Sequence, residues 1–258
     1  MTFDADQYRA LGSTGIHVSP LGLGTVKFGR NVGVKYPSGF SLPDDAALAR
    51  LISVAKENGI NLIDTAPAYG NSEERLGKLL RGKRSDWIIC TKVGERFDNG
   101  ASTWDFSDKA TRTSIESSLQ RLDTDVLDIV LVHCSDDDEH VLKHTDVMET
   151  LAKLKQEGKV RYIGASTKST EGGFAALPLS DVVMVTYNVT DASQLPVLER
   201  AAAESKGVLV KKALLSGHTA SADTALRFAL GHPAVSSVIV GTIDERHLIA
   251  NVAAVAAD

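Results

Sequence analysis

The chain has 258 residues, of which 43% are hydrophobic and 24% are charged, and its formal net charge is −5 at pH 7. This composition is typical of a globular protein and excludes a disordered, collagen-like or low-complexity chain. The basic residues form no stripe, and no apolar run is long enough to span a bilayer. We therefore expect neither a nucleic acid nor a membrane as a partner.

Two further features predict the cellular compartment. Residues 1–7 are polar and include two Asp, so they do not resemble a signal peptide. The two cysteines, Cys90 and Cys134, lie in apolar, strand-like runs, where reduced and buried thiols are expected. Both features favour a cytoplasmic protein.

Short apolar segments alternate along the chain with longer amphipathic segments. Residues 129–132 are apolar at consecutive positions, as a strand of a parallel sheet requires when both of its faces are buried. Eight segments of this kind are predicted to be strands: Leu21–Thr25, Asn61–Thr65, Trp87–Val93, Leu127–Cys134, Arg161–Thr167, Asp181–Asn188, Val208–Ala213 and Val235–Gly241.

The segments between these strands have helical periodicity. The first predicted helix follows Pro43 and stops at Gly59, and the second opens at Ser72. Helices are predicted over Asp44–Asn58, Ser72–Leu80, Lys109–Leu122, Asp146–Glu157, Gln194–Ser205, Ala222–Leu230 and Glu245–Val255. The Gly-rich segment after Ser169 is expected to be a loop or one weak helix.

Eight strand–helix units in about 250 residues predict a closed (β/α)8 TIM barrel rather than an open doubly wound sheet. No linker rich in Pro, Gly or Ser divides the chain, so residues 1–258 are predicted to form a single domain. Tyr8–Ser19 is predicted to be a short N-terminal β-hairpin at the bottom of the barrel. The long segment Lys27–Leu42 follows the first strand, on the face where barrels place functional loops.

Polar residues end three successive predicted strands. These are Asp64, Lys92 and His133, and Tyr69 follows Asp64 by five residues. The carboxyl ends of barrel strands meet at one mouth, so we expect these side chains to converge. Because an unpaired charge in an apolar strand is costly, Asp64 and Lys92 are expected to form an ion pair. A structural ion pair would explain those two residues alone, but the added Tyr and His favour a catalytic site.

These residues belong to motifs by which the sequence closely resembles the aldo-keto reductase superfamily. The matching stretches run from residue 8 to about residue 251: Tyr8–Gly15, Leu21–Thr25, Asp64–Gly70, Ser72–Gly77, Thr91–Lys92, Val132–His133, Gly158–Ser166 and Gly241–Leu248. The resemblance implies a (β/α)8 barrel that uses NADPH or NADH to reduce aldehydes and ketones without a metal. The catalytic Asp, Tyr, Lys and His of that family match Asp64, Tyr69, Lys92 and His133.

The chemistry of carbonyl reduction accounts for these residue types. Hydride delivery to a carbonyl carbon builds negative charge on the oxygen, which must then be protonated. A phenol is an adequate acid if its pKa of about 10 is lowered, and we expect the Lys92 ammonium to lower that of Tyr69 by stabilising the phenolate. Asp64 would keep Lys92 charged, and His133 would donate a hydrogen bond to the carbonyl oxygen.

The resemblance also implies a set of cofactor contacts at the strand ends. Ser166 matches the Ser that hydrogen-bonds the nicotinamide carboxamide. Thr167 stands where Asn is usual, Met184 where Gln is common, and no aromatic residue near Lys211 could stack on the nicotinamide ring. The remaining expected cofactor contacts are Gly24, Thr25, Tyr187, Lys211, Gly241, Arg246, His247 and Asn251.

The start of the last predicted helix bears on the choice of cofactor. A helix N-terminus attracts anions, and in the family this region binds the adenosine half of the cofactor. Arg246 and His247 would supply positive charge for the 2′-phosphate of NADPH. Glu245 would repel that phosphate or accept a hydrogen bond from a ribose hydroxyl, as in NAD sites. We expect NADP(H), with NAD(H) as the alternative.

Some weaker patterns have two interpretations. Asp136–His140, with His144 four residues later, has the composition of a metal site, but an acidic, solvated loop leading into a helix explains it, and no metal is expected. Such a negative rim would disfavour anionic substrates. Phe97 and Trp104 either face the substrate or pack in a loop.

Two other functions remain open beside a reductase that acts on a small carbonyl compound. One is a nucleotide-binding regulatory protein with the same fold and negligible turnover. The other is an aldolase that forms a Schiff base on Lys211 or Lys212, although the favoured interpretation of these lysines is a contact with a phosphate or ribose, or simple exposure. The oligomeric state is left open.

Overall fold

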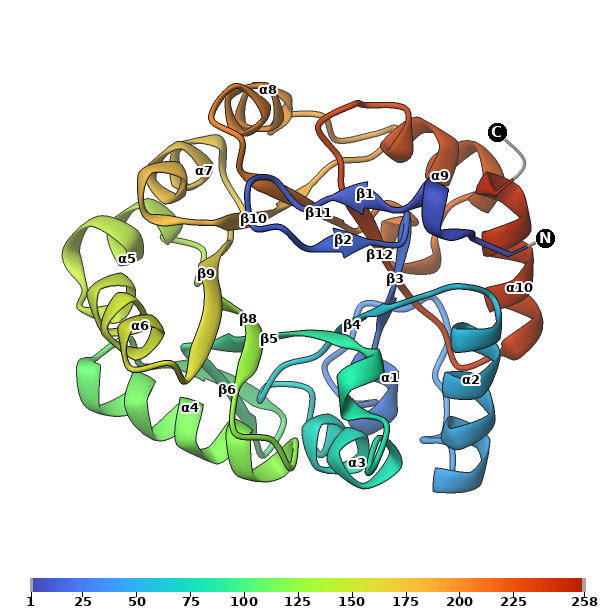
Figure 1. Cartoon of the computed structure of the whole chain (residues 1–258), viewed down its shortest axis with the longest axis horizontal. Helices are drawn as coiled ribbons and strands as arrows, with labels where there is room; N and C mark the ends of the chain where they lie inside the picture. The colour runs from blue at the N-terminus through green and yellow to red at the C-terminus, as the bar shows by residue number, and fades with distance from the viewer. Residues whose placement is uncertain (1, 257–258) are drawn as a thin grey trace.

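The computed structural model describes residues 2–256. Eight parallel strands close into a barrel in the order β10-β11-β12-β3-β4-β5-β8-β9, and helices surround it (Figure 1). The predicted (β/α)8 barrel is therefore confirmed. Its strands are β3 (Leu21–Gly24), β4 (Leu62–Asp64), β5 (Ile88–Val93), β8 (Leu127–His133), β9 (Val160–Ser166), β10 (Val182–Thr186), β11 (Gly207–Lys211) and β12 (Ser237–Gly241).

The seven predicted helices lie close to their predicted positions, whereas the short helices over Val26–Gly29 and Asp138–His144 were not predicted. Five of the helices begin at side-chain caps that accept from a backbone N–H: Asp44, Ser107, Ser169, Ser221 and Asp244. The Gly-rich segment after Ser169 is a capped helix. The α-helices are α1 (Val26–Gly29), α2 (Asp45–Glu57), α3 (Ser72–Leu79), α4 (Asp108–Arg121), α5 (Asp138–His144), α6 (Val147–Gln156), α7 (Thr170–Ala176), α8 (Leu195–Ala203), α9 (Ala222–Leu230) and α10 (Glu245–Val255).

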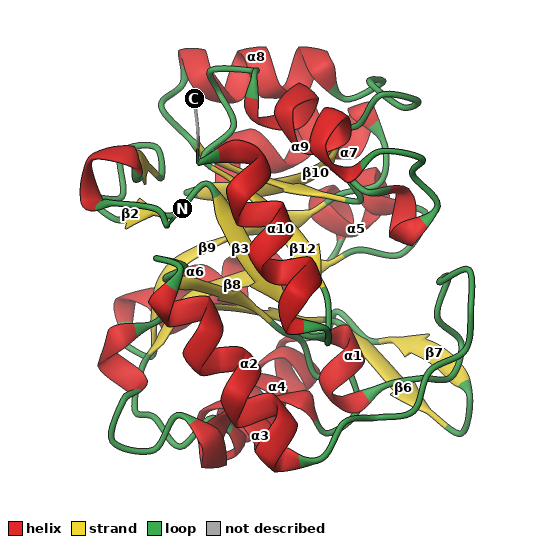
Figure 2. Ribbon diagram, turned by 90° about the vertical axis from the view of Figure 1, so that its right-hand side faces the viewer, coloured by secondary structure: helices red, strands yellow, loops and turns green. Residues whose placement is uncertain are grey.

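Two hairpins lie outside the barrel strands, at opposite ends of the barrel (Figure 2). The predicted N-terminal hairpin pairs β1 (Arg9–Ala10) with β2 (His17–Val18). Beside it, Leu11 and Val18 are fully buried and belong to the apolar cluster of the barrel interior. This hairpin therefore closes the N-terminal end of the barrel.

The second hairpin replaces the loop that was expected after the third barrel strand. It pairs β6 (Glu95–Asp98) with β7 (Ala101–Trp104). The turn is Asn99–Gly100, and both residues have positive φ. Asn-Gly is the preferred dipeptide of such a two-residue turn, so the sequence carried a signal that the strand prediction did not use.

The core forms two apolar layers. One fills the barrel interior, with Leu62, Ile129, Leu131 and Leu209 among its buried members. The other lies between the barrel and its surrounding helices. Most of the strands are continuous apolar runs because they contribute side chains to both layers; β3 contributes Leu21 and Leu23 to the outer layer only. Of the described helices, none combines the length and the apolar character needed to cross a membrane.

Candidate active site

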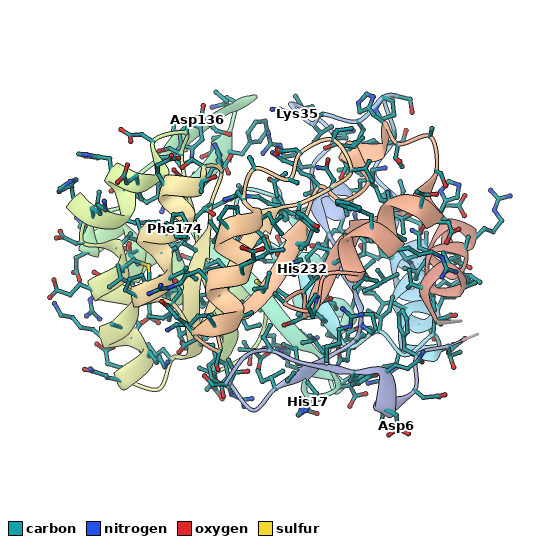
Figure 3. All side chains as sticks on the ribbon, turned by 90° about the horizontal axis from the view of Figure 1, so that it is seen from above. Asp6, His17, Lys35, Asp136, Phe174 and His232 are labelled. Atoms are coloured by element: carbon teal, nitrogen blue, oxygen red, sulfur yellow. The ribbon has the colours of Figure 1, made fainter. Side chains whose placement is uncertain are left out.

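The polar strand ends converge on one cavity of about 690 Å³ at the carboxyl end of the barrel. Asp64, Tyr69, Lys92 and His133 all line it. Figure 3 shows Lys35 and Asp136 at this end of the molecule, whereas His17 and Asp6 mark the opposite end. All four expected catalytic residues therefore lie together.

Asp64 and Lys92 form a buried ion pair at the floor of the cavity. The Lys92 Nζ lies 2.5 Å from Asp64 Oδ1 and also donates to the Thr65 carbonyl oxygen at 2.9 Å. The two side chains are only 1% and 5% exposed. Burial alone would lower the pKa of Lys92, but the Asp64 carboxylate outweighs it, so the pKa of Lys92 is raised. The pairing keeps Lys92 protonated in the cavity wall.

Tyr69 lies beside this charge. The Lys92 Nζ is 4.8 Å from the centre of the Tyr69 ring. We expected a lowered phenol pKa, but burial raises the pKa of Tyr69 more than Lys92 lowers it. The hydroxyl is thus protonated at neutral pH, which suits a proton donor. Lys92 is placed to stabilise the phenolate that a proton transfer would leave.

His133 faces Tyr69 in the cavity, and its ring also contacts the carboxylate of Glu95. The two rings lie edge to face, with their centroids 6.1 Å apart. The His133 Nδ1 is 2.8 Å from Glu95 Oε2. Burial lowers the pKa of His133, and Glu95 opposes this effect. Glu95 lies on the unpredicted hairpin, so this contact was not predicted.

Seven of the expected cofactor residues line the cavity: Gly24, Ser166, Met184, Lys211, Gly241, His247 and Asn251. The Lys211 Nζ donates to the Ser166 hydroxyl at 2.8 Å. Burial, followed by the charge of Lys212, lowers the pKa of Lys211 to about 7. This contact connects two residues of the expected cofactor site.

The other four expected cofactor residues do not line the cavity, and each is engaged elsewhere. Thr25 is fully buried and donates to the Asp64 carbonyl oxygen. Thr167 is fully buried and accepts from Gln194. Successive side chains alternate between the two faces of a strand, so a neighbour of Gly24 or Ser166 points away from the cavity.

Tyr187 and Arg246 contact residues outside the cavity. Tyr187 stacks on Phe228 of α9, with ring centroids 4.9 Å apart. The guanidinium of Arg246 lies 2.9 Å from the Asp244 carboxylate, and the Arg246 side chain is 88% exposed. Neither side chain reaches the cavity in this arrangement.

The structure corrects the expected acidic rim. Asp138 is not solvated: it is 2% exposed, and it accepts hydrogen bonds from the Lys168 and Ser169 backbones and from the Ser169 hydroxyl. The exposed Asp136 pairs with the Lys168 Nζ at 2.7 Å. Asp136 and Asp138 therefore bind the loop that follows β9 and do not form an acidic rim. Within residues 2–256, no three His, Cys, Asp or Glu side chains gather in a geometry that could hold a metal ion.

Phe97 and Trp104 do not line the cavity either. The Phe97 ring packs under the Arg30 guanidinium at 3.3 Å, and Trp104 is 41% exposed, with its ring 5.8 Å from the Lys168 Nζ. Lys27 and Lys168 do line it, although the sequence did not single them out. Lys27 lies 4.0 Å from the centre of the Tyr36 ring, in the long segment after the first strand.

Comparisons with known proteins agree with this geometry. A model of the aldo/keto reductase family matches residues 20–222. L-galactose dehydrogenase of Arabidopsis thaliana is 32% identical over 96% of this chain and 88% of its own length. A solved structure from Pseudomonas aeruginosa, assigned to the aldo-keto reductases, is 50% identical with a TM-score of 0.91, and the match covers 98% of this chain and 95% of that chain.

A more distant structure has the same architecture. The holo form of an aldo-keto reductase from Bacillus halodurans is 27% identical with a TM-score of 0.81, and the match covers 96% of this chain and 90% of that chain. The chain is an oxidoreductase and belongs to the aldo/keto reductase family.

Proposed function

We propose that the protein interconverts a carbonyl compound and the corresponding alcohol by hydride transfer with NADP(H), and that Tyr69 is its general acid and base. The observation that carries this proposal is the buried Asp64–Lys92 pair beside Tyr69, with His133 facing the same cavity. A buried charge pair adds little to the stability of a fold, so its place beside a phenol in a cavity favours a functional role, such as stabilising a phenolate.

The cavity suits a nicotinamide cofactor, which supplies the hydride when it is bound. The Ser166 hydroxyl lines the cavity and is available to the carboxamide. At Gly24 and Gly241 the backbone itself forms the wall, and a Cβ at either position would lie within 3.1 Å of a neighbouring side-chain atom. His247 and Asn251, from α10, would hold the adenosine half near the helix N-terminus.

In the reducing direction, residues of this chain protonate the carbonyl oxygen of the substrate and stabilise the charge that develops on it. Tyr69 donates its phenolic proton to the carbonyl oxygen as negative charge develops there. Lys92 stabilises the resulting phenolate, and Asp64 keeps Lys92 charged and oriented. His133 contacts the same oxygen from the other side and orients the substrate. Oxidation of an alcohol runs through the same groups in reverse.

The preference for NADP(H) rests on His247 rather than on Arg246. His247 lines the cavity, whereas the guanidinium of Arg246 is paired with Asp244. A cationic or hydrogen-bonding group in the first turn of α10 suits the 2′-phosphate. Use of NAD(H) is the alternative, because the same turn carries Glu245.

Replacement of Tyr69 by Phe tests the proposal. Removing the proton donor should reduce kcat by about 10²–10⁴-fold while NADPH still binds. Oxidation of NADPH and NADH would be followed by absorbance across a panel of aldehydes, ketoses and quinones, with NADPH affinity measured by fluorescence titration. Full activity of Tyr69→Phe would contradict the role of Tyr69. Tight NADPH binding by a wild type that turns over no carbonyl compound would favour the regulatory alternative.

A further inference from the structure

The β6–β7 hairpin holds a partly buried carboxylate against His133. Glu95 is the first residue of β6, and its side chain is 12% exposed. One of its oxygens, Oε1, accepts from the Ser102 hydroxyl of β7 at 2.5 Å and lies 4.0 Å from the Arg30 guanidinium. The other oxygen, Oε2, lies 2.8 Å from His133 Nδ1. The two oxygens of this carboxylate therefore have different partners.

The cation beside Oε1 is fixed in place. The Arg30 guanidinium lies 3.3 Å from the centre of the Phe97 ring and donates to the Ala68 carbonyl oxygen at 3.1 Å. A guanidinium donates hydrogen bonds but cannot accept them. The surroundings of Oε1 therefore require an acceptor at that position, whichever side chain occupies it.

The partner of His133 is ionised wherever a histidine titrates. Burial would raise the pKa of Glu95, but His133, Ser102 and Arg30 together outweigh burial and lower it to about 2. A carboxylate has acceptor oxygens alone, so an unprotonated Nδ1 at 2.8 Å would set two lone pairs against each other. His133 Nδ1 therefore carries a proton whether the ring is neutral or charged.

This arrangement decides what His133 offers to a substrate. Since Nδ1 faces Glu95 and His133 lines the cavity, Nε2 is the ring nitrogen left for the substrate. With the proton on Nδ1, a neutral ring presents a lone pair at Nε2, and the imidazolium alone presents an N–H there. A carbonyl oxygen is repelled by the lone pair and accepts a hydrogen bond from the N–H.

We propose that Glu95 is a positioning residue that keeps the single proton of neutral His133 on Nδ1, so that reduction of a carbonyl compound requires the His133 imidazolium and slows as the pH rises. This inference rests on the proposed function, in which His133 contacts the carbonyl oxygen and Tyr69 protonates it. It adds a second protonation state on which the reducing direction depends.

The charged groups around His133 set the pH at which this dependence is expected. Burial lowers the pKa of His133 from its ordinary 6.5, Glu95 opposes this effect, and the charges of Lys92 and Lys211 add to it. Burial raises the pKa of Tyr69, so Tyr69 stays protonated through the same range. Reduction should therefore be fastest below the pKa of His133 and decline above it.

The pH profile of wild type and of Glu95→Gln tests the inference. With NADPH and an aldehyde that does not titrate, such as 4-nitrobenzaldehyde, kcat/KM of wild type should fall about tenfold or more between about pH 5.5 and about pH 8. In Glu95→Gln, the amide oxygen is expected to face Ser102 and Arg30, so the NH₂ group faces Nδ1 and the ring proton moves to Nε2. Its profile should be nearly flat, and its kcat/KM at about pH 8 should exceed that of wild type by about tenfold. A flat wild-type profile, or the same fall in Glu95→Gln, would overturn the inference.

Two further variants show which group causes the fall. Lys211 also titrates near neutrality, because its pKa is about 7. Lys211→Met should keep the fall with pH, and so should Asp98→Asn, which neutralises an exposed carboxylate on the same hairpin. A fall that vanishes in Lys211→Met and persists in Glu95→Gln would assign the pH dependence to Lys211, and the inference would be wrong.

Nitrogen-15 NMR of the histidine rings tests the position of the proton without turnover. The signals of His133 are assigned by their absence in His133→Asn. At about pH 8, wild type should show a protonated Nδ1 and a bare Nε2, and Glu95→Gln the reverse. A protonated Nε2 in neutral wild-type His133 would refute the role of Glu95 and leave the proposed function standing. Failure to reduce any carbonyl compound at any pH would instead contradict the proposed function.

Discussion

Two lysines on barrel strands show how pairing, more than burial, decides the charge of a side chain in this cavity. Lys92 has the Asp64 carboxylate at 2.5 Å, and its pKa is raised. Lys211 has the neutral hydroxyl of Ser166 as its partner, and burial lowers its pKa to about 7. One cavity therefore holds a permanent cation and an amine that titrates near neutrality.

Removing the Asp64 charge tests this account of Lys92. Asp64→Asn leaves a buried ammonium without its counter-charge, so we expect a loss of about 3–5 kcal/mol in the free energy of unfolding. The pKa of Lys92 should fall, and the pH profile of kcat should shift with it. Urea unfolding and pH–rate measurements check both effects. Glu74→Gln, which breaks an exposed pair with Lys78, is the matched control. A pH profile and a stability both equal to wild type would show that Asp64 does not support Lys92.

Lys211 makes a prediction about stability and pH. Its pKa is about 7 in the folded protein and 10.5 ordinarily, so between these values the unfolded chain binds a proton that the folded protein does not. Wild-type stability therefore rises with pH across this window. Lys211→Met removes that dependence, so its gain in stability over wild type should be largest at pH 7 and below, and should disappear by about pH 10.5.

Unfolding in urea at several pH values measures this difference. Lys143→Met, at an exposed site, is the control and should show no such trend. A gain from Lys211→Met that is equal at about pH 6 and about pH 10 would mean that the Lys211 ammonium is not destabilised by its surroundings.

At the scale of the element, the charged residues at the N-terminus of α10 pair with each other. Asp244 caps the helix by accepting from the Arg246 backbone, and its carboxylate also pairs with the Arg246 guanidinium. The acidic cap and the first basic residue thus satisfy each other on the surface. His247, one residue further round the helix, is left to face the cavity.

The preference for NADPH over NADH should therefore depend on His247 and not on Arg246. His247→Ala should weaken NADPH binding by about tenfold and NADH binding much less, because only NADPH carries the 2′-phosphate. Arg246→Ala should leave the ratio of the two affinities unchanged. Fluorescence titration with both cofactors makes the comparison. A changed ratio in Arg246→Ala would mean that its guanidinium leaves Asp244 to bind the phosphate, and a wild type that prefers NADH would reverse the proposed choice of cofactor.

At the scale of the whole molecule, barrel closure depends on close approach between strands. Gly164 of β9 pairs in register with Val182 of β10. A Cβ on Gly164 would lie 1.7 Å from the Val182 carbonyl oxygen, which is backbone and cannot rotate away. The absence of a side chain at this position lets β9 and β10 pair and so brings Ser166 and Met184 to the same cavity.

Gly164→Ala should therefore destabilise the fold by about 3 kcal/mol or more, since the strands must separate. Thermal and urea unfolding of the variant measure the loss. Gly39→Ala is the control, because a Cβ there has no atom within 4 Å and φ is ordinary, so stability should change by less than about 0.5 kcal/mol. Equal stability of Gly164→Ala and wild type would show that β9 and β10 adjust without cost.

Much of the fold could be predicted because its signals are local. Continuous apolar runs marked the barrel strands, and caps and glycines marked the helices. The convergence of Asp64, Lys92 and His133 also follows from local order, since parallel strands bring their carboxyl ends to one rim. The hairpin at Asn99–Gly100 was predictable from its turn residues, although the strand pattern passed over it.

The sequence by itself determined the barrel fold, the strands that carry the catalytic residues and the family motifs. Only the tertiary structure decided which side of each strand end faces the cavity, so that Ser166 enters it and Thr167 does not. It also paired Arg246 with Asp244 and placed Glu95 behind His133. The physical reason is that side-chain direction and charge pairing depend on neighbours that are distant along the chain, and only the folded packing brings these neighbours together.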